Sequence, residues 1–167
     1  MTTILGIDPG TLVTGYGILK KNGRGQFCAL DYGSISPPKK LLLTERYRII
    51  YEGVCLLMDK FQVEALAIET QFIDKNPQSG IKLGMARGIV ILAATLRKIP
   101  VFEYAPTRAK KAVMGRGRAS KHQVQGMIKT LLGLTTIPEP EDAADALALA
   151  FCHGHTLILG NGEEFKI

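Results

Sequence analysis

The sequence predicts an α/β fold with a mixed five-stranded sheet flanked by helices. Three short apolar runs joined by tight turns open the chain, a pattern typical of an antiparallel meander. A helical pattern then leads into a fourth apolar run, and such a crossover favours parallel pairing with the first strand. A fifth run follows a second long helix. With 167 residues, the chain is long enough for one domain with a sizeable core.

The three opening strands are expected at 4–8, 14–19 and 26–34, because each is a short apolar run bounded by turn residues. An Asn-Gly pair between the second and the third is a strong hairpin signal. The first strand ends on Asp8, directly before a Pro-Gly turn. A carboxylate at the end of a buried strand is costly without a partner, so something must compensate Asp8.

Two glycines in the second strand, Gly15 and Gly17, leave space beside the first strand. Without side chains at these positions, a backbone segment or a ligand can come close to Asp8. The sequence does not say which of the two fills the space.

The first long helix is expected over 42–60, where apolar residues recur at helical spacing. The apolar run that follows, 63–69, again ends in a carboxylate, Glu69. Parallel pairing with the first strand would place Asp8 and Glu69 at the same end of adjacent strands. Ligands of open α/β sheets gather at that end.

The second long helix is expected over 76–98, with an Asn cap followed by Pro in the first turn. Gly80, Gly84 and Gly88 recur every fourth residue along one face of it. Each glycine costs roughly 1 kcal/mol relative to alanine in a helix interior. Close backbone approach on that face is therefore expected, either by packing against the sheet or by pairing with a second copy across a dimer interface.

The remaining elements are a fifth strand over 99–104, a short helix or turn over 106–111, a helix over 120–132 with a Ser-Gln capping box, and a last helix over 141–155. Residues 1–156 are expected to form a single domain and residues 157–167 a flexible tail.

Composition narrows the functional classes. The net charge of +6 is a mild indication of a polyanionic partner. Three cysteines without CxxC spacing favour reduced thiols and a cytoplasmic location. We see no apolar run of about 18 residues and no basic-then-apolar start, so neither a membrane span nor a signal peptide is expected.

Two acids at the start of the last helix, Asp142 and Asp145, are three residues apart and share a face. Acids in a first helical turn also stabilise the helix dipole, so this pair alone is weak support for a site. Alanines around the pair keep the helix slim, which allows it to lie against the sheet. Together with Asp8 and Glu69, the pair forms a candidate cluster of four carboxylates, which repel one another unless cations or protons intervene.

Such a cluster offers only oxygen ligands, which suit Mg²⁺ or Mn²⁺. Two of these ions about 4 Å apart stabilise the attacking and leaving oxygens of a phosphodiester displacement. Glycoside hydrolysis needs only two carboxylates and fits the basic net charge less well.

Three segments resemble the signature motifs of the RuvC family of crossover (Holliday) junction endodeoxyribonucleases: Ile-Leu-Gly-Ile-Asp-Pro-Gly at 4–10, Ala-Ile-Glu at 67–69 and Asp-Ala-Ala-Asp-Ala at 142–146. Segments 83–88 and 101–104 also resemble that family. The resemblance implies a ribonuclease H-like fold and a homodimer that nicks two opposed strands of a four-way DNA junction in homologous recombination and DNA repair. It further implies two Mg²⁺ or Mn²⁺ ions per subunit and a branch-migration complex of the RuvA and RuvB type as partner.

The resemblance assigns roles to single residues. Asp8, Glu69, Asp142 and Asp145 match the four acids of the family, which bind metal and are catalytic. Lys110 and Lys121 resemble two catalytically important basic residues of the family. Residues expected to contact DNA are the base-stacking Phe72 and the basic Lys75, Arg108, Lys111, Arg116 and Arg118.

Three other functions were weighed. A ribonuclease acting on RNA or RNA–DNA hybrids shares the expected fold, and a non-catalytic junction-binding protein would share the basic surface. A phosphotransferase of the actin-like ATPase type also uses an Asp-x-Gly-Thr segment, but it needs two related domains. No second glycine-rich phosphate segment is visible in the sequence.

Overall fold

A computed structural model describes residues 1–70 and 76–167 of the chain. Its sheet has the order β3-β2-β1-β4-β5. The strands are β1 (Thr2–Asp8), β2 (Thr14–Lys21), β3 (Phe27–Ile35), β4 (Ala65–Glu69) and β5 (Val101–Tyr104). Strand β1 runs antiparallel to β2 and parallel to β4, and β4 runs parallel to β5. The predicted meander, crossover and mixed five-stranded sheet are therefore confirmed.

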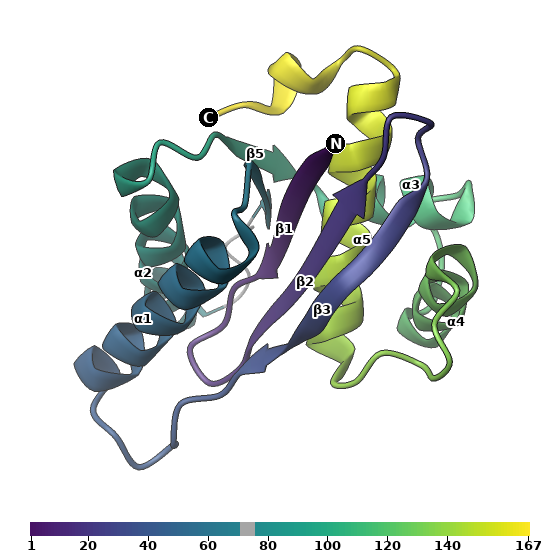
Figure 1. The fold of residues 1–167 in the computed structure, drawn as a ribbon. Helices are drawn as coiled ribbons and strands as arrows, with labels where there is room; N and C mark the ends of the chain where they lie inside the picture. The colour runs from purple at the N-terminus through teal and green to yellow at the C-terminus, as the bar shows by residue number, and fades with distance from the viewer. Residues whose placement is uncertain (71–75) are drawn as a thin grey trace.

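Helices cover both faces of the sheet (Figure 1). They are α1 (Leu43–Phe61), α2 (Pro77–Leu96), α3 (Pro106–Met114), α4 (Lys121–Leu132) and α5 (Glu141–Ile158), followed by a short 3₁₀ helix, η1 (Gly162–Phe165). Because successive side chains of a strand point to opposite faces, β1 contributes to two cores. Leu5 and Ile7 pack with α1 and α2, and Ile4 packs with the helices α3, α4 and α5.

Local signals placed most helix ends correctly. The Asn76 side chain accepts hydrogen bonds from the backbone N–H groups at the start of α2, with Pro77 at the first position. Ser120 and Gln123 form the predicted capping box of α4, and Gly133 ends that helix with φ 63°. The expected helix or turn after Pro106 is a helix of 9 residues. Strands β4 and β5 begin two residues later than predicted.

Helix α2 is buried on one side only. Ala86, Val90, Ala93 and Ala94 face the core, whereas Gly84 is exposed, and a Cβ added to it would meet nothing within 4 Å. Gly88 is equally open. The interpretation that these two glycines allow α2 to pack against the sheet is therefore wrong.

Length and composition alone would allow α2 to cross a membrane. Its most apolar 18-residue window has a mean hydropathy of 1.4, and only 22% of that window is buried. Its exposed side carries large apolar side chains, namely Ile81, Met85, Leu92 and Leu96, each more than half exposed.

The C-terminal residues pack against the sheet edge at β5. The ring of Phe165 stacks on Tyr104 with centroids 5.0 Å apart, and the Ile167 N–H donates to the carbonyl of Val101 at 3.0 Å. Strand edges leave backbone groups open for pairing, and here the tail occupies part of that edge. The sequence analysis did not anticipate these contacts, while the division into a domain of 1–156 and a flexible tail stays a prediction.

Candidate active site

The parallel pairing of β1 with β4 brings two acids together. The register places Ile7 opposite Ile68, so the strands end side by side on Asp8 and Glu69. This is the arrangement that the two apolar runs ending in carboxylates predicted. Since both strands end at the same edge, their acids converge at the ligand-binding end of the sheet.

Helix α5 lies directly on β1 and β2 because glycines make room for it. A Cβ added to Gly6 would come within 1.9 Å of the carbonyl oxygen of Ala146, and one added to Gly15 within 2.1 Å of that of Asp142. Any side chain at either position would push the helix backbone away from the sheet. The space beside the second strand is therefore filled by a backbone segment, which carries Asp142 and Asp145 to the end of β1.

A cavity of about 150 Å³ opens where these elements meet. Its polar lining consists of Asp8, Glu69, Asp145, Lys110 and Lys121. Five of the six residues expected to be catalytic thus face one small space. The sixth, Asp142, does not line the cavity, but its charge acts on Asp8 and Asp145.

Burial dominates the electrostatics of Asp8. It raises the pKa of that carboxyl group from 3.8 to about 8, assisted by the charge of Glu69 and by a hydrogen bond between the two carboxyl groups. The charges of Asp145 and Asp142 add to the effect. At neutral pH in the absence of a cation, Asp8 therefore keeps a proton and donates it to Glu69.

The other lining acids are also shifted upward. Burial raises the pKa of Glu69 and that of Asp145, in the latter case against the opposing charge of Lys121. The Lys121 ammonium nitrogen lies 3.3 Å from an Asp145 carboxylate oxygen and 3.6 Å from one of Glu141. Burial is the largest cause of each upward shift, and neighbouring carboxylates add to it although the lysines act in the opposite direction on Glu69 and Asp145.

The donor set fits a divalent cation of the Mg²⁺ or Mn²⁺ kind. It consists of carboxylate oxygens that are partly buried beside one another, and a cation would offset both their burial and their mutual repulsion. Within residues 1–70 and 76–167, no three His, Cys, Asp or Glu side chains are already arranged around one point as ligands. Bound cations would displace the proton that Asp8 donates to Glu69.

The predicted DNA-contacting residues differ in position. Lys111, Arg116 and Arg118 are exposed on α3 and the loop that follows it. Arg108 is exposed too, but its guanidinium group lies over the ring of Phe165, 4.0 Å from the ring centroid. Phe72 and Lys75 lie outside the described residues.

Sequence reasoning missed one pair beside the site. Arg87 on α2 donates from Nε to the main-chain carbonyl of Glu69 at 3.3 Å, and its guanidinium group pairs with the carboxylate of Glu103 on β5. Both residues fall inside segments that resembled the RuvC family, which was the available signal. Their spacing of 16 residues carries no local pattern that would reveal the contact.

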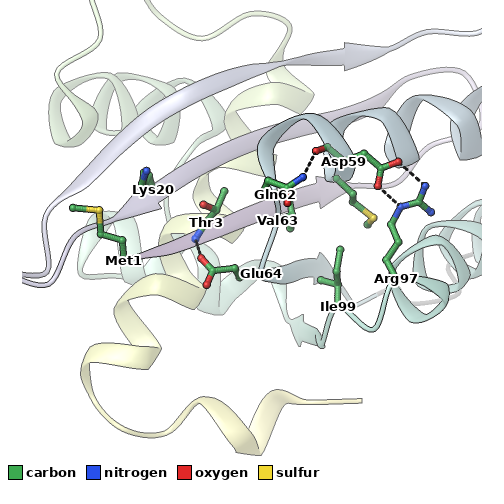
Figure 2. A pocket seen from close by; sticks show the side chains of 10 residues that line it. Met1, Thr3, Lys20, Asp59, Gln62, Val63, Glu64, Arg97 and Ile99 are labelled. Carbon is green, nitrogen blue, oxygen red and sulfur yellow. Dashed lines mark hydrogen bonds and ion pairs between the residues drawn. The ribbon is translucent and has the colours of Figure 1, made fainter.

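A larger hollow of about 630 Å³ lies at the opposite end of the sheet (Figure 2). Both acids that line it already have partners: Arg97 binds Asp59 with contacts of 2.7 and 2.8 Å, and the Glu64 carboxylate accepts from the backbone N–H of Thr3 at 2.8 Å. Among the residues that the structure describes, this hollow therefore lacks a group of neighbouring carboxylates like the one at the end of β1.

Comparison with known proteins matches the site and the fold. A family profile described as "Crossover junction endodeoxyribonuclease RuvC" covers residues 4–153. The chain is 55% identical over 156 residues to the protein of that name from Protochlamydia amoebophila, covering 93% of this chain and 92% of that one. The protein from Chlamydia caviae is 52% identical over 155 residues, with 92% of each chain covered.

A solved structure agrees over the whole length. The structure of T. thermophilus RuvC in complex with Holliday junction substrate superposes with a TM-score of 0.92 and 31% identity, covering 100% of both chains. The yeast mitochondrial Holliday junction resolvase, 13% identical with a TM-score of 0.64 over 97% of this chain, shares the fold. The expected resolvase fold, of the ribonuclease H-like type, is thereby confirmed.

Proposed function

The chain belongs to the RuvC family of crossover junction endodeoxyribonucleases, and we propose that it resolves Holliday junctions by nicking two opposed strands of four-way DNA. The observation that carries the proposal is the convergence of acids from β1, β4 and α5 beside two lysines in one cavity. A relative with 31% identity along its full length has been solved with a Holliday junction substrate. Recombination and DNA repair are the processes in which such junctions arise.

We assign the four acids to two divalent cations, Mg²⁺ or Mn²⁺. When bound, these ions supply stabilisation of the attacking and leaving oxygens of the phosphodiester. Asp8 and Glu69 hold them from the sheet, and Asp142 and Asp145 from α5. The upward pKa shifts of Asp8, Glu69 and Asp145 support this assignment, because burial and neighbouring carboxylates disfavour the charged forms and a bound cation would offset both effects.

The two lysines of the cavity complete the site. Lys110 and Lys121 line it together with the acids and place positive charge where a phosphate group would enter. Lys121 also holds Asp145 through its 3.3 Å ion pair. Around them, Lys111, Arg116 and Arg118 offer exposed cations for the DNA backbone.

Lys121→Met is expected to lower the single-turnover cleavage rate by about 100-fold, because preorganised charge at the reacting phosphate is lost. The dissociation constant for the junction should change less than threefold. Rates at saturating protein, together with gel-shift titration in EDTA, measure the two effects. The control is Lys129→Met, on the same helix but away from the cavity, which should cleave normally. A Lys121→Met enzyme with an unchanged rate would contradict the role.

We further propose a homodimer that pairs through α2. Two symmetric nicks need two sites facing one junction, which a two-fold dimer supplies. The half-exposed apolar side chains of α2 beside the open Gly84 and Gly88 support this face as the interface.

Because the curated relatives are bacterial, we propose that the reaction takes place in the cytoplasm. We further propose a branch-migration complex of the RuvA and RuvB type as partner.

Cleavage of a synthetic mobile four-way junction tests the function directly. In Mg²⁺, the purified protein should nick two opposed strands at symmetric positions, mapped to the nucleotide on all four strands. Duplex DNA and an RNA–DNA hybrid of the same sequence should stay intact, and EDTA should abolish the nicks. Digestion of the hybrid in preference to the junction would favour a ribonuclease. Junction binding without nicks would favour a non-catalytic binding protein.

A further inference from the structure

We propose that Arg87 is a positioning residue that ties α2 to the last residue of β4 and thereby fixes Glu69 in the acid cluster. The inference rests on the proposed function, in which Glu69 is a metal ligand. Arg87 does not reach the cavity itself. It acts on the main chain that carries the Glu69 side chain.

The contacts of Arg87 lead to two adjacent strand ends. Nε donates to the carbonyl of Glu69 at 3.3 Å, and the guanidinium group pairs with Glu103. In the parallel register Glu103 lies opposite Ile68, one residue before the partner of Glu69. The side chains of Arg87 and Glu103 are only 19% and 29% exposed. One planar donor fork therefore holds the carboxyl ends of β4 and β5 at once.

This support is needed because Glu69 lies just beyond the last residue of β4 that pairs with β1. The β1–β4 ladder ends with Ile7 opposite Ile68, one residue before Glu69. On the other side, the N–H of Thr70 donates to the carbonyl of Tyr104 at 2.9 Å. The Glu69 carbonyl lies past the last β1 pair, and Arg87 provides a donor for it. A metal ligand at a strand end needs such a partner to keep its side chain aimed.

Arg87 also links the site to the exposed face of α2. Gly88 is the next residue, and Gly84 lies one turn earlier, both on the open face. The same turn of α2 therefore carries the open glycines on its exposed side and the Arg87 contacts to β4 and β5 on its inner side. A shift of α2 along or around its axis would move the donor of the Glu69 carbonyl.

A second arginine of the same helix provides a matched control. Arg97 caps the C-terminal end of α2 and pairs with Asp59 on α1, at the far end of the sheet (Figure 2). Its side chain is 26% exposed, close to the value for Arg87. Both substitutions to methionine remove a charge and an ion pair from a half-buried site on α2. Only one of the two pairs touches an acid of the cluster.

The test compares Arg87→Met with Arg97→Met by three measurements on the full-length protein. Titration calorimetry with Mn²⁺ alone should give an affinity about tenfold weaker for Arg87→Met, the usual effect of losing an outer partner of a metal ligand. Hydrogen exchange of the Thr70 amide should become faster. Junction binding in EDTA should stay within twofold of the wild type. Arg97→Met should show wild-type Mn²⁺ affinity and wild-type Thr70 exchange.

Equal Mn²⁺ affinity in the two variants overturns the inference. If Arg87→Met does not fold by circular dichroism, Arg87→Lys replaces it. Lysine cannot bridge the Glu69 carbonyl and Glu103 as a fork, so its Mn²⁺ affinity should also fall, and an unchanged value again overturns the clamp. Glu69→Gln is measured alongside. Unchanged Mn²⁺ affinity together with junction cleavage in Glu69→Gln would show that the proposed role of Glu69 as a metal ligand, and not the clamp alone, has failed.

Discussion

Asp8→Asn is expected to abolish junction cleavage, leave junction binding intact and stabilise the protein in the absence of metal. Cleavage is lost because an amide cannot supply the anionic oxygen that divalent cations need. Binding is expected to persist because the contacts to DNA are proposed to come from exposed basic residues of α3 and the following loop. Stability rises because an amide needs no proton at this position, whereas the Asp8 carboxyl group must either keep one or carry a charge beside other carboxylates.

The sign of the stability effect follows from the raised pKa of Asp8. In the folded protein the pKa of Asp8 is about 8, whereas in the unfolded chain the carboxyl group has its ordinary pKa of 3.8. Between these values the folded state binds more protons, so the stability of the wild type falls as pH rises from about 4 to about 8. An asparagine does not titrate and can still donate to Glu69. Its advantage should therefore grow across this window.

At pH 8 without metal we expect Asp8→Asn to gain about 2 kcal/mol, which raises Tm by roughly 4–8 °C in a domain of this size. Thermal melts at pH 5, 6.5 and 8 in EDTA measure the trend, and added Mn²⁺ should raise the Tm of the wild type more than that of the variant. The control is Asp31→Asn on β3, which should cleave normally. Wild-type cleavage by Asp8→Asn, or a lower Tm at pH 8, would contradict the prediction.

The residues of the site that lie at strand ends were predictable because a local sequence pattern marks them. An apolar run that ends in an acid, repeated after a helical crossover, places Asp8 and Glu69 side by side by topology alone. Asp142 and Asp145 were harder, since acids also favour helix starts. Their approach to the sheet depends on Gly6 and Gly15, which accept the α5 backbone where any Cβ would collide.

What escaped prediction depends on side-chain direction and on burial. The contact of Arg87 with Glu103 and the Glu69 carbonyl joins three elements, and no periodicity reports it. Phe165 belongs to a segment expected to be flexible, and no sequence pattern indicates that its ring contacts Tyr104 and Arg108. The glycine spacing on α2 indicated that another backbone comes close to this helix, but it did not say which one. Small and apolar residues on a helix face fit packing against a sheet as well as packing against a second copy of the helix.

The exposed face of α2 supplies the second prediction with a large effect. Met85→Glu should convert the protein to a monomer and reduce paired cleavage of a junction by more than about 100-fold. Met85 is 52% exposed, one residue from the open Gly84, and lies among other exposed apolar side chains of the helix. Burying an unpaired carboxylate twice in a symmetric interface costs several kcal/mol, enough to dissociate a dimer held at micromolar affinity.

Sedimentation velocity at micromolar protein concentration measures the association state, and strand-resolved gels distinguish paired from single nicks. Leu131→Glu on α4 is the matched control, because Leu131 is also exposed (42%) but belongs to a helix on the other face of the sheet. It should sediment and cleave like the wild type.

The monomeric variant also separates assembly from chemistry. Met85 is 52% exposed and belongs to neither hydrophobic core, so Met85→Glu should keep the wild-type Tm within about 3 °C, in line with other exposed substitutions. If α2 needs the second subunit to hold Arg87 against the Glu69 carbonyl, the Mn²⁺ affinity of Met85→Glu should fall. If α2 holds Arg87 in place alone, the affinity should stay at the wild-type value. An unchanged dimer would place the interface elsewhere. A monomer with paired nicks at the wild-type rate would mean that two-fold assembly is not what coordinates the two cuts.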